Sequence, residues 1–242
     1  MSLQCVILAG GEGTRMRPAT NDLPKTMLSV GGKPFAHHQL SLLAQCGVER
    51  VLYSTGHKGQ LIRDFVRNGR AWNLNVDWVE DGPTLRGTGG ALRAAMDAGA
   101  LEEEFLVLYG DSYLPIEMVP VEESFRRSGL PALMTVFHNR GQWDVSNVLL
   151  CGQRVELYDK LRRDARSASM EHIDYGLSVL TRDVIRQRIG AGERADLADV
   201  FHALSLEGQL AGHLATERFY EIGSAAGLAE FDALMRARAP HA

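Results

Sequence analysis

The sequence predicts an α/β protein, with a Rossmann-like, mostly parallel sheet, helices on both faces and a small β-rich insertion. Short apolar segments alternate with helical patterns over the first 140 residues, and this alternation favours a parallel sheet covered on both sides. A glycine-rich segment follows the first apolar run, Leu3 to Leu8. In such sheets ligands bind beyond the carboxyl ends of the strands, so this segment marks the expected binding edge.

Each element is expected from its own residues. Short apolar runs predict strands at 3–8, 50–54, 75–79, 104–109 and 131–137, and helical patterns lie between them at 35–46, 57–68, 89–98 and 119–128. In the first helix Ala36, Leu40 and Leu43 share one face, and Gly47 is placed to cap its C-terminus. From about residue 143 the pattern changes to a hairpin of 145–150 with 154–158, a strand at 173–180, and helices at 196–207 and 224–237.

The composition is that of an ordinary globular protein. The chain has 242 residues, of which 45% are apolar and 23% charged, with a net charge of −4. These values favour one domain, 1–242, and give no reason to expect nucleic acid or a membrane as a partner. Cys5, Cys46 and Cys151 are widely separated and odd in number, which suggests neither a disulfide framework nor a zinc site. The sequence shows no secretory signal or bilayer-spanning run, so the expected location is cytoplasmic.

The segment after the first strand is suited to binding phosphate. It begins at Leu8 and Ala9 and leaves the backbone bare at three glycines, Gly10, Gly11 and Gly13. Bare backbone lets N–H groups close around phosphate oxygens. Positive charge follows at Arg15, Arg17 and Lys25. The sequence therefore predicts a polyanion site, and the alternative is a tight turn whose charges face water.

Two familiar phosphate motifs are excluded by the spacing. No Gly-Lys-Ser/Thr closes the loop, so it is not a Walker loop. Arg15 and Met16 stand where a dinucleotide fingerprint needs its third glycine, which argues against a nicotinamide-dependent oxidoreductase.

The whole string resembles the signature of sugar-1-phosphate nucleotidyltransferases, also called nucleoside-diphosphate-sugar pyrophosphorylases. The matching residues are Gly10, Gly11, Gly13, Thr14, Arg15, Met16, Pro18, Pro24, Lys25, Met27, Gly32 and Pro34. Thr26 stands where the family has a second proline. The resemblance implies that 1–140 forms a nucleotide-binding part, and that 141–242 forms a sugar-phosphate-binding part with closing helices. It also implies that Arg15 and Lys25 hold the triphosphate.

A second glycine-rich segment runs from Glu80 to Ala91, between a strand and a helix. N–H groups at a helix start attract polar or anionic ligands. The segment resembles the family's loop that holds the nucleobase and ribose, with Arg86 inserted before it. The resemblance places Glu80, Gly87, Thr88 and Gly89 in the nucleotide site. A glycine-rich helix cap without a ligand is the alternative.

Asp111 follows an apolar strand and Gly110, where Mg²⁺ could bridge phosphates, and Mg²⁺ usually takes only one or two carboxylates. By resemblance Asp111 is the family's first metal ligand and contacts the substrate. The second metal ligand would be Glu221, in Glu-Ile-Gly-Ser where the family has Asp-x-Gly-Thr. An isolated Gly-Asp is otherwise typical of a turn.

Residues for the acceptor are expected later in the chain. Tyr158-Asp159-Lys160 and His172-Ile173-Asp174-Tyr175-Gly176 resemble family segments that contact the sugar phosphate and the sugar. Asn147 resembles the family's Asn-Val before these strands. The resemblance thus assigns Asn147, Lys160, Asp174 and Gly176 to substrate binding.

These parts predict an enzyme that transfers a nucleotidyl group from a nucleoside triphosphate, GTP favoured, to a sugar 1-phosphate with Mg²⁺ as cofactor. No Ser-His-Asp or Cys-His set points to a covalent intermediate, whereas glycine loops, cations and a metal suit in-line transfer at phosphorus. The motifs resemble most those of short heptose-1-phosphate guanylyltransferases. Mannose-1-phosphate guanylyltransferases, muramyl or glucose-1-phosphate uridylyl- or thymidylyltransferases, and a non-catalytic nucleotide-sugar-binding module remain alternatives. The sequence leaves a homo-oligomer open.

Overall fold

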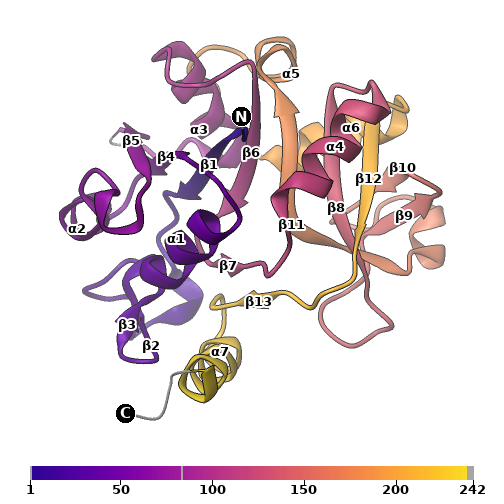
Figure 1. The fold of residues 1–242 in the computed structure, drawn as a ribbon. Coiled ribbons are helices and arrows are strands. Elements are labelled where there is room, and N and C mark those ends of the chain that lie inside the picture. Colours follow the sequence, from indigo (N-terminus) through magenta and orange to yellow (C-terminus); the bar gives the residue numbers. More distant parts are fainter. Residues whose placement is uncertain (1, 83, 239–242) are drawn as a thin grey trace.

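A nine-stranded sheet forms the centre of the molecule (Figure 1). The computed structural model describes residues 2–82 and 84–238. In spatial order the strands are β5 (Asn75–Glu80), β4 (Arg50–Thr55), β1 (Gln4–Ala9), β6 (Glu104–Tyr109), β11 (His172–Thr181), β8 (Ala132–His138), β12 (Leu210–Ala215), β10 (Arg154–Tyr158) and β9 (Val148–Cys151). Both halves of the chain contribute strands to this one sheet, and the division into two functional parts stays a prediction.

The two ends of the sheet differ in strand direction. β5, β4, β1 and β6 are mutually parallel, as the alternation of strands and helices predicts. β11 then runs antiparallel to both β6 and β8, β12 is parallel to β8, and the β9–β10 hairpin is antiparallel. The carboxyl ends of the four parallel strands therefore meet at one edge, and the mixed half lies beside it.

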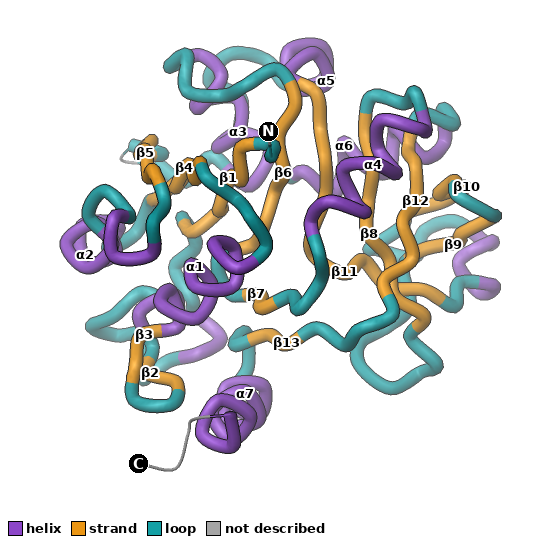
Figure 2. The backbone as a smooth tube through the Cα atoms, in the orientation of Figure 1, coloured by secondary structure: helices purple, strands orange, loops and turns teal. Residues whose placement is uncertain are grey.

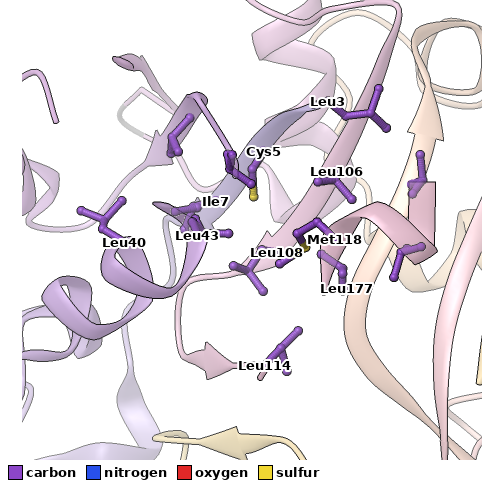
Figure 3. Close-up of a cluster of buried hydrophobic side chains, with 14 of the residues drawn as sticks. Leu3, Cys5, Ile7, Leu40, Leu43, Leu106, Leu108, Leu114, Met118 and Leu177 are labelled. Carbon is purple, nitrogen blue, oxygen red and sulfur yellow. The ribbon is translucent and has the colours of Figure 1, made fainter. Parts of the chain in front are cut away.

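Helices cover both faces of the sheet. α1 (Phe35–Gln45), α2 (Gly59–Val66) and α4 (Met118–Ser128) pack on one face, and α3 (Gly87–Asp97), α5 (Arg182–Arg188) and α6 (Leu197–Leu206) on the other. Side chains of β1 alternate between these faces, because successive strand residues point to opposite sides. Figure 3 shows Cys5 and Ile7 on the α1 side, near Leu40 and Leu43, whereas Val6 and Leu8 belong to the other core.

The C-terminal segment returns to the parallel half of the molecule (Figure 2). β13 (Tyr220–Glu221) pairs antiparallel with β7 (Ser112–Tyr113), and α7 (Ala225–Arg238) follows. Phe231 of α7 is fully buried against Phe35 and Tyr113. The short hairpin of β2 (Ser29–Val30) and β3 (Lys33–Pro34) lies beside it. This packing places Glu221 close to the residues that follow the end of β6.

The expected elements are present, with boundaries that shift by three residues at most. The largest shift is the start of the hairpin, at Val148 instead of 145, because Asn139 donates hydrogen bonds to the Asp144 carbonyl (2.6 Å) and the Ser146 hydroxyl (3.0 Å) and holds this segment as a loop. The sequence pattern did not predict α5, β12 and the two-residue strands. No helix among the described residues is long and apolar enough to cross a membrane.

Candidate active site

A cavity of about 230 Å³ opens at the carboxyl edge of the four parallel strands. Of the residues predicted for the nucleotide or the metal, eight line it: Leu8, Ala9, Gly10, Gly11, Lys25, Gly87, Thr88 and Asp111. Its other lining residues were not predicted for the site, among them Ser54, Asp81, Leu85 and Tyr109. The fold thus brings the two glycine-rich segments and the end of β6 around one space.

Two glycines beside the cavity leave space that a side chain at either position would fill. A Cβ on Gly110 would lie 2.9 Å from the Cβ of Ala9 and 3.0 Å from the Leu8 carbonyl oxygen. A Cβ on Gly10 would lie 2.4 Å from Oδ2 of Asp81. At Gly110 the crowding atoms belong to β1, so this glycine lets the end of β6 approach β1. At Gly10 the crowding atom is the tip of the Asp81 side chain, so this glycine leaves room for that carboxyl group. Gly11, by contrast, has open space at its Cβ position.

Lys25 and Asp111 form an ion pair at the cavity wall. Nζ of Lys25 lies 2.5 Å from Oδ2 of Asp111, and both side chains are mostly withdrawn from water. The hydroxyl of the next residue, Thr26, donates to the Gly110 carbonyl at 3.3 Å, so the lysine segment is tied to the aspartate turn. A cation and a carboxylate that share one wall can bind phosphate oxygens and a metal ion side by side.

Gln39 of α1 holds the turn around Asp111 by hydrogen bonds, a role that was not predicted from the sequence. Its side-chain amide donates to the carbonyls of Tyr109 (2.9 Å) and Ser112 (2.8 Å), on both sides of Asp111. Gln39 is only 1% exposed, although it lies on α1 among apolar residues. A buried amide on an apolar helix face needs such partners. That anomaly in the helix pattern is the signal that could have found it.

Strand pairing places Glu221 near Asp111. β13 pairs Glu221 with Ser112, and the Ile222 N–H donates to the Asp111 carbonyl at 3.0 Å. Burial, followed by the neighbouring carboxylates of Asp111, Asp174 and Asp144, raises the pKa of Glu221 to about 7, although the ammonium of Lys25 opposes this rise. Several acidic groups thus surround Glu221 with one nearby ammonium group, an arrangement that favours binding of a cation.

The predicted acceptor residues also come together. Oδ1 of Asn147 accepts the N–H of Asp174 at 2.9 Å, and Oδ1 of Asp174 accepts the N–H of Gly176 at 2.9 Å. Gly176 has a φ of +99° and lies next to Ser112, the residue after Asp111. Burial raises the pKa of Asp174 to about 6, against the opposing effects of the Gly176 N–H and the charge of Lys160. Lys160 itself is exposed.

Asp159 organises the loop that follows Lys160. Its Oδ2 accepts the Asp164 N–H at 2.8 Å and the Ser167 hydroxyl at 3.0 Å. Burial raises the pKa of Asp159, but these hydrogen bonds outweigh burial and hold the pKa below its ordinary value. The carboxylate of Asp159 therefore serves to hold this loop through hydrogen bonds within the protein.

Some predicted nucleotide residues do not line the cavity. Gly13, Thr14 and Arg15 sit in or beside the short helix Thr14–Met16, where Arg15 is exposed. Glu80 pairs with Arg63 at 3.3 Å on the exposed side of β5. The N–H groups of Gly89 and Gly90 are both donated to the Ala195 carbonyl, so they fasten α3 to the segment before α6. Their roles in binding stay predictions.

An arginine clasp joins three segments beside Glu221. The guanidinium of Arg218 lies 3.7 Å from the ring centre of Trp143 and 4.7 Å from that of Tyr220. It also forms two hydrogen bonds of 2.6 Å with Glu230 of α7. Cation–π contacts and a bidentate ion pair hold the loop before β9, strand β13 and α7 together.

The comparisons with known proteins agree with this architecture. The family model of the MobA-like NTP transferase domain matches residues 5–188, about three quarters of the chain. The chain belongs to this family. The match runs from β1 to the end of α5 and includes every residue at the cavity wall.

Relatives of this NTP transferase domain carry related names. A mannose-1-phosphate guanylyltransferase of Mycobacterium tuberculosis is 36% identical over 112 residues, which are 46% of this chain and 30% of that protein. A D-glycero-alpha-D-manno-heptose 1-phosphate guanylyltransferase of Aneurinibacillus thermoaerophilus is 32% identical over 48% of this chain and 49% of that protein. A glucose-1-phosphate cytidylyltransferase of Salmonella typhimurium is 26% identical over 76% of this chain and 77% of that protein. The first two matches span half or less of those relatives.

Solved structures confirm the fold. HddC from Yersinia pseudotuberculosis, complexed with GMP-PN, superposes with a TM-score of 0.74 at 23% identity and covers 96% of this chain and 99% of that chain. The inositol-1-phosphate CTP transferase from T. maritima superposes with a TM-score of 0.77 at 20% identity over 100% and 98%. The Rossmann-like nucleotidyltransferase fold predicted from the sequence is thereby confirmed.

Proposed function

We propose that this NTP transferase domain transfers a nucleotidyl group from a nucleoside triphosphate to a sugar 1-phosphate and releases pyrophosphate. The observation that carries the proposal is the adjacency of two groups of residues. Lys25 and Asp111 line the cavity, and the residue after Asp111 is Ser112. Ser112 lies beside Gly176, one of the residues predicted to bind the acceptor. A donor nucleotide and an acceptor phosphate bound at these two places would meet at Asp111.

The residues present fit a magnesium ion. Within residues 2–82 and 84–238, no three His, Cys, Asp or Glu side chains are arranged to hold a metal. Magnesium bound with a nucleotide needs only one or two carboxylates, because phosphate oxygens and water complete its shell. Asp111 and Glu221 are adjacent through β7 and β13 and would supply them. When bound, the ion would neutralise charge on the phosphate groups.

The protein's own groups act by binding and orienting. Backbone N–H groups of Gly10 and Gly11 and the ammonium of Lys25 would hold the donor phosphates, and Lys160 would hold the acceptor phosphate. A sugar 1-phosphate already carries an anionic oxygen, so its attack on the α-phosphorus needs no strong general base. Catalysis in such a site comes mainly from positioning and charge neutralisation. Arg15 is exposed and does not line the cavity, and its guanidinium would contact the triphosphate from the solvent side.

For the substrates we propose GTP and a manno-configured heptose 1-phosphate, in a pathway of nucleotide-sugar biosynthesis in the cytoplasm. Two relatives named as guanylyltransferases, for mannose 1-phosphate and for a manno-heptose 1-phosphate, support this choice, as does the complex of HddC with GMP-PN. Mannose 1-phosphate is the second candidate. Relatives named as uridylyl- and cytidylyltransferases make the other bases the required comparison.

A pyrophosphate-release assay tests the activity. The full chain is incubated with Mg²⁺, one of GTP, UTP, CTP, dTTP or ATP, and one of a panel of hexose and heptose 1-phosphates. We expect pyrophosphate only when both substrates are present, and most of it with GTP and the heptose phosphate. Tight nucleotide binding by calorimetry without turnover on any pair would identify a non-catalytic binding module instead.

A further inference from the structure

The turn between β4 and α2, residues 56–58, packs against the first glycine-rich segment, residues 10–25. The His57 N–H donates to the Gly10 carbonyl at 3.3 Å. A Cβ on Gly56 would lie 2.8 Å from the same carbonyl oxygen, so this approach requires glycine there. No residue of the turn lines the cavity, and the proposed mechanism uses none of them.

Lys58 extends this contact to a second place in the glycine-rich segment. Its Nζ donates to the Thr20 carbonyl at 3.1 Å and also to the Asn21 carbonyl. In the part of the chain that the structure describes, Lys58 belongs to no ion pair. Its ammonium group therefore serves main-chain oxygens, and these lie outside the helices and strands that would otherwise pair them.

The backbone of Lys58 has a conformation that is unusual for a lysine. Its φ is +57° and its ψ is +25°, in the left-handed region, which is unfavourable for most residues with a Cβ. Glycine would adopt this conformation without strain. Strain that persists at one residue is a reason to look for a role of its side chain, and here that side chain ends on the glycine-rich segment.

The segment that Lys58 contacts carries two of the cations proposed to bind the triphosphate. Thr20 is only 3% exposed, and its hydroxyl donates to the Gly13 carbonyl at 2.9 Å. A Cβ on Gly13 would lie 3.0 Å from Cγ of Lys25. Close contacts thus continue from the ammonium of Lys58 to the stem of Lys25, and Arg15 lies in the same segment.

We propose that Lys58 is a positioning residue that holds residues 10–25 in the conformation that binds the donor triphosphate. Most side chains from 11 to 23 are exposed, so little apolar burial fixes the segment and its hydrogen bonds have to do so. A nucleotide that binds only the ordered form has its apparent affinity reduced by the fraction of chains in that form. The inference rests on the proposed function for the ligand, and loss of the ammonium is expected to weaken nucleotide binding.

Hydrogen exchange without nucleotide, followed by mass spectrometry, tests the positioning directly. The N–H groups of Met16 and Asn21 are hydrogen-bonded to carbonyls of the same segment. In Lys58→Gly, peptides that cover them should exchange roughly tenfold faster, the size expected for loss of a hydrogen bond to a charged group. The Tm should not fall, because glycine relieves the backbone strain. Asn73→Gly makes the same change at another left-handed residue and should leave this exchange unaltered.

Calorimetry with Mg²⁺ and the nucleoside triphosphate that the wild type binds most tightly measures the consequence. The Kd should rise roughly tenfold in Lys58→Gly and Lys58→Met, whereas kcat at saturating nucleotide and the KM for the sugar phosphate should stay near wild type. Thr20→Val removes the next hydrogen bond without changing charge and should also raise the Kd. The double variant should lose less than the product of the two single losses, because both bonds act on one segment.

Several results would overturn the inference. Unchanged exchange in both Lys58 variants would do so whatever their activity, and the use of two substitutions guards against misfolding of one. Weaker nucleotide binding with unchanged exchange, or with a silent Thr20→Val, would reduce Lys58 to a charge acting at a distance. Faster exchange with wild-type nucleotide affinity would disconnect the segment from the donor. Faster exchange and weaker nucleotide binding, in a chain that releases no pyrophosphate on any substrate pair, would refute the proposed transfer and leave the positioning role standing.

Discussion

The proposed nucleotide side of the candidate site and its proposed acceptor side are built in different ways. The nucleotide side uses loops that directly follow β1, β5 and β6, in a stretch from residue 8 to residue 111. The acceptor side combines a loop before β9, the end of β10, the start of β11 and strand β13. Parallel strands place their carboxyl ends at one edge automatically, whereas the acceptor side depends on long-range pairing. The first is thus readable as contiguous motifs, whereas the separate segments of the second come together only through the topology.

Removing the charge of Asp111, where the two sides meet, is expected to have the largest effect. Asp111→Asn keeps the shape of the side chain but loses the carboxylate that would hold the metal. We expect kcat to fall by roughly a hundredfold or more, because charge neutralisation in the transition state is worth several kcal/mol. Pyrophosphate release at saturating substrates measures it, and Glu123→Gln, an exposed carboxylate on α4, is the control.

Glu221→Gln separates the contributions of the two carboxylates. A similar loss of kcat, with more magnesium needed for half-maximal rate, is expected if Glu221 is the second ligand, and Glu221→Asp should retain activity. If Glu221→Gln is silent while Asp111→Asn is not, Asp111 holds the ion alone with phosphates and water. Wild-type turnover by Asp111→Asn would remove the metal from the mechanism.

The contrast also explains what the sequence could predict. Most strands and helices and eight residues of the cavity follow from apolar periodicity and from short motifs at strand ends. Gly89 was assigned to the nucleotide, but the Ala195 carbonyl, more than a hundred residues later in the chain, takes its N–H. Ser54 and Gln39 were missed, because a lone polar residue in a strand or helix gives no local signal of what it faces. The strand β12 was missed since Gly212 and His213 interrupt its apolar pattern.

The acceptor side can be tested separately through Lys160. Lys160→Ala is expected to raise the KM for the sugar phosphate by roughly tenfold to a hundredfold, because a charged hydrogen bond contributes about 1.5–3 kcal/mol. Nucleotide binding, measured by calorimetry without acceptor, should stay near wild type. Arg163→Ala provides a control for loss of one positive charge on the same loop. A collapse of nucleotide binding in Lys160→Ala would show that the two sides are not independent.

The arginine clasp should have a smaller effect, limited to the acceptor side. Arg218→Met removes the contacts to Trp143, Tyr220 and Glu230 but leaves every predicted ligand-binding group in place. We expect the KM for the sugar phosphate to rise by several-fold while the KM for the nucleotide changes little, since a cation–π contact contributes about 0.5–2 kcal/mol. Arg188→Met breaks a similar pair with Glu207, far from the site in the contact between α5 and the end of α6, and should change neither KM. Equal changes of KM in Arg218→Met and Arg188→Met would mean that the arginine clasp contributes only to the general stability of the fold.

The smallest expected effect is a pH dependence of stability that originates on the acceptor side. Burial raises the pKa of Asp174 from 3.8 to about 6, although the Gly176 N–H and Lys160 oppose it. The folded chain therefore holds this proton more tightly than the unfolded chain, and stability must fall as pH rises from about 4 through 6. Asp174→Asn abolishes this loss and keeps an oxygen for the Gly176 N–H.

We expect thermal unfolding with EDTA and without substrates to give Asp174→Asn the same Tm as wild type, or a lower one, near pH 4. Above pH 7 the Tm of the variant should gain a few degrees relative to wild type, since about 1 kcal/mol shifts Tm by about 2–4 °C in a chain of this size. Asp77→Asn, exposed on β5, should follow the wild-type profile throughout. Parallel profiles for Asp174→Asn and wild type would mean that Asp174 ionises normally, and the acceptor side would then carry full negative charge before any substrate phosphate arrives.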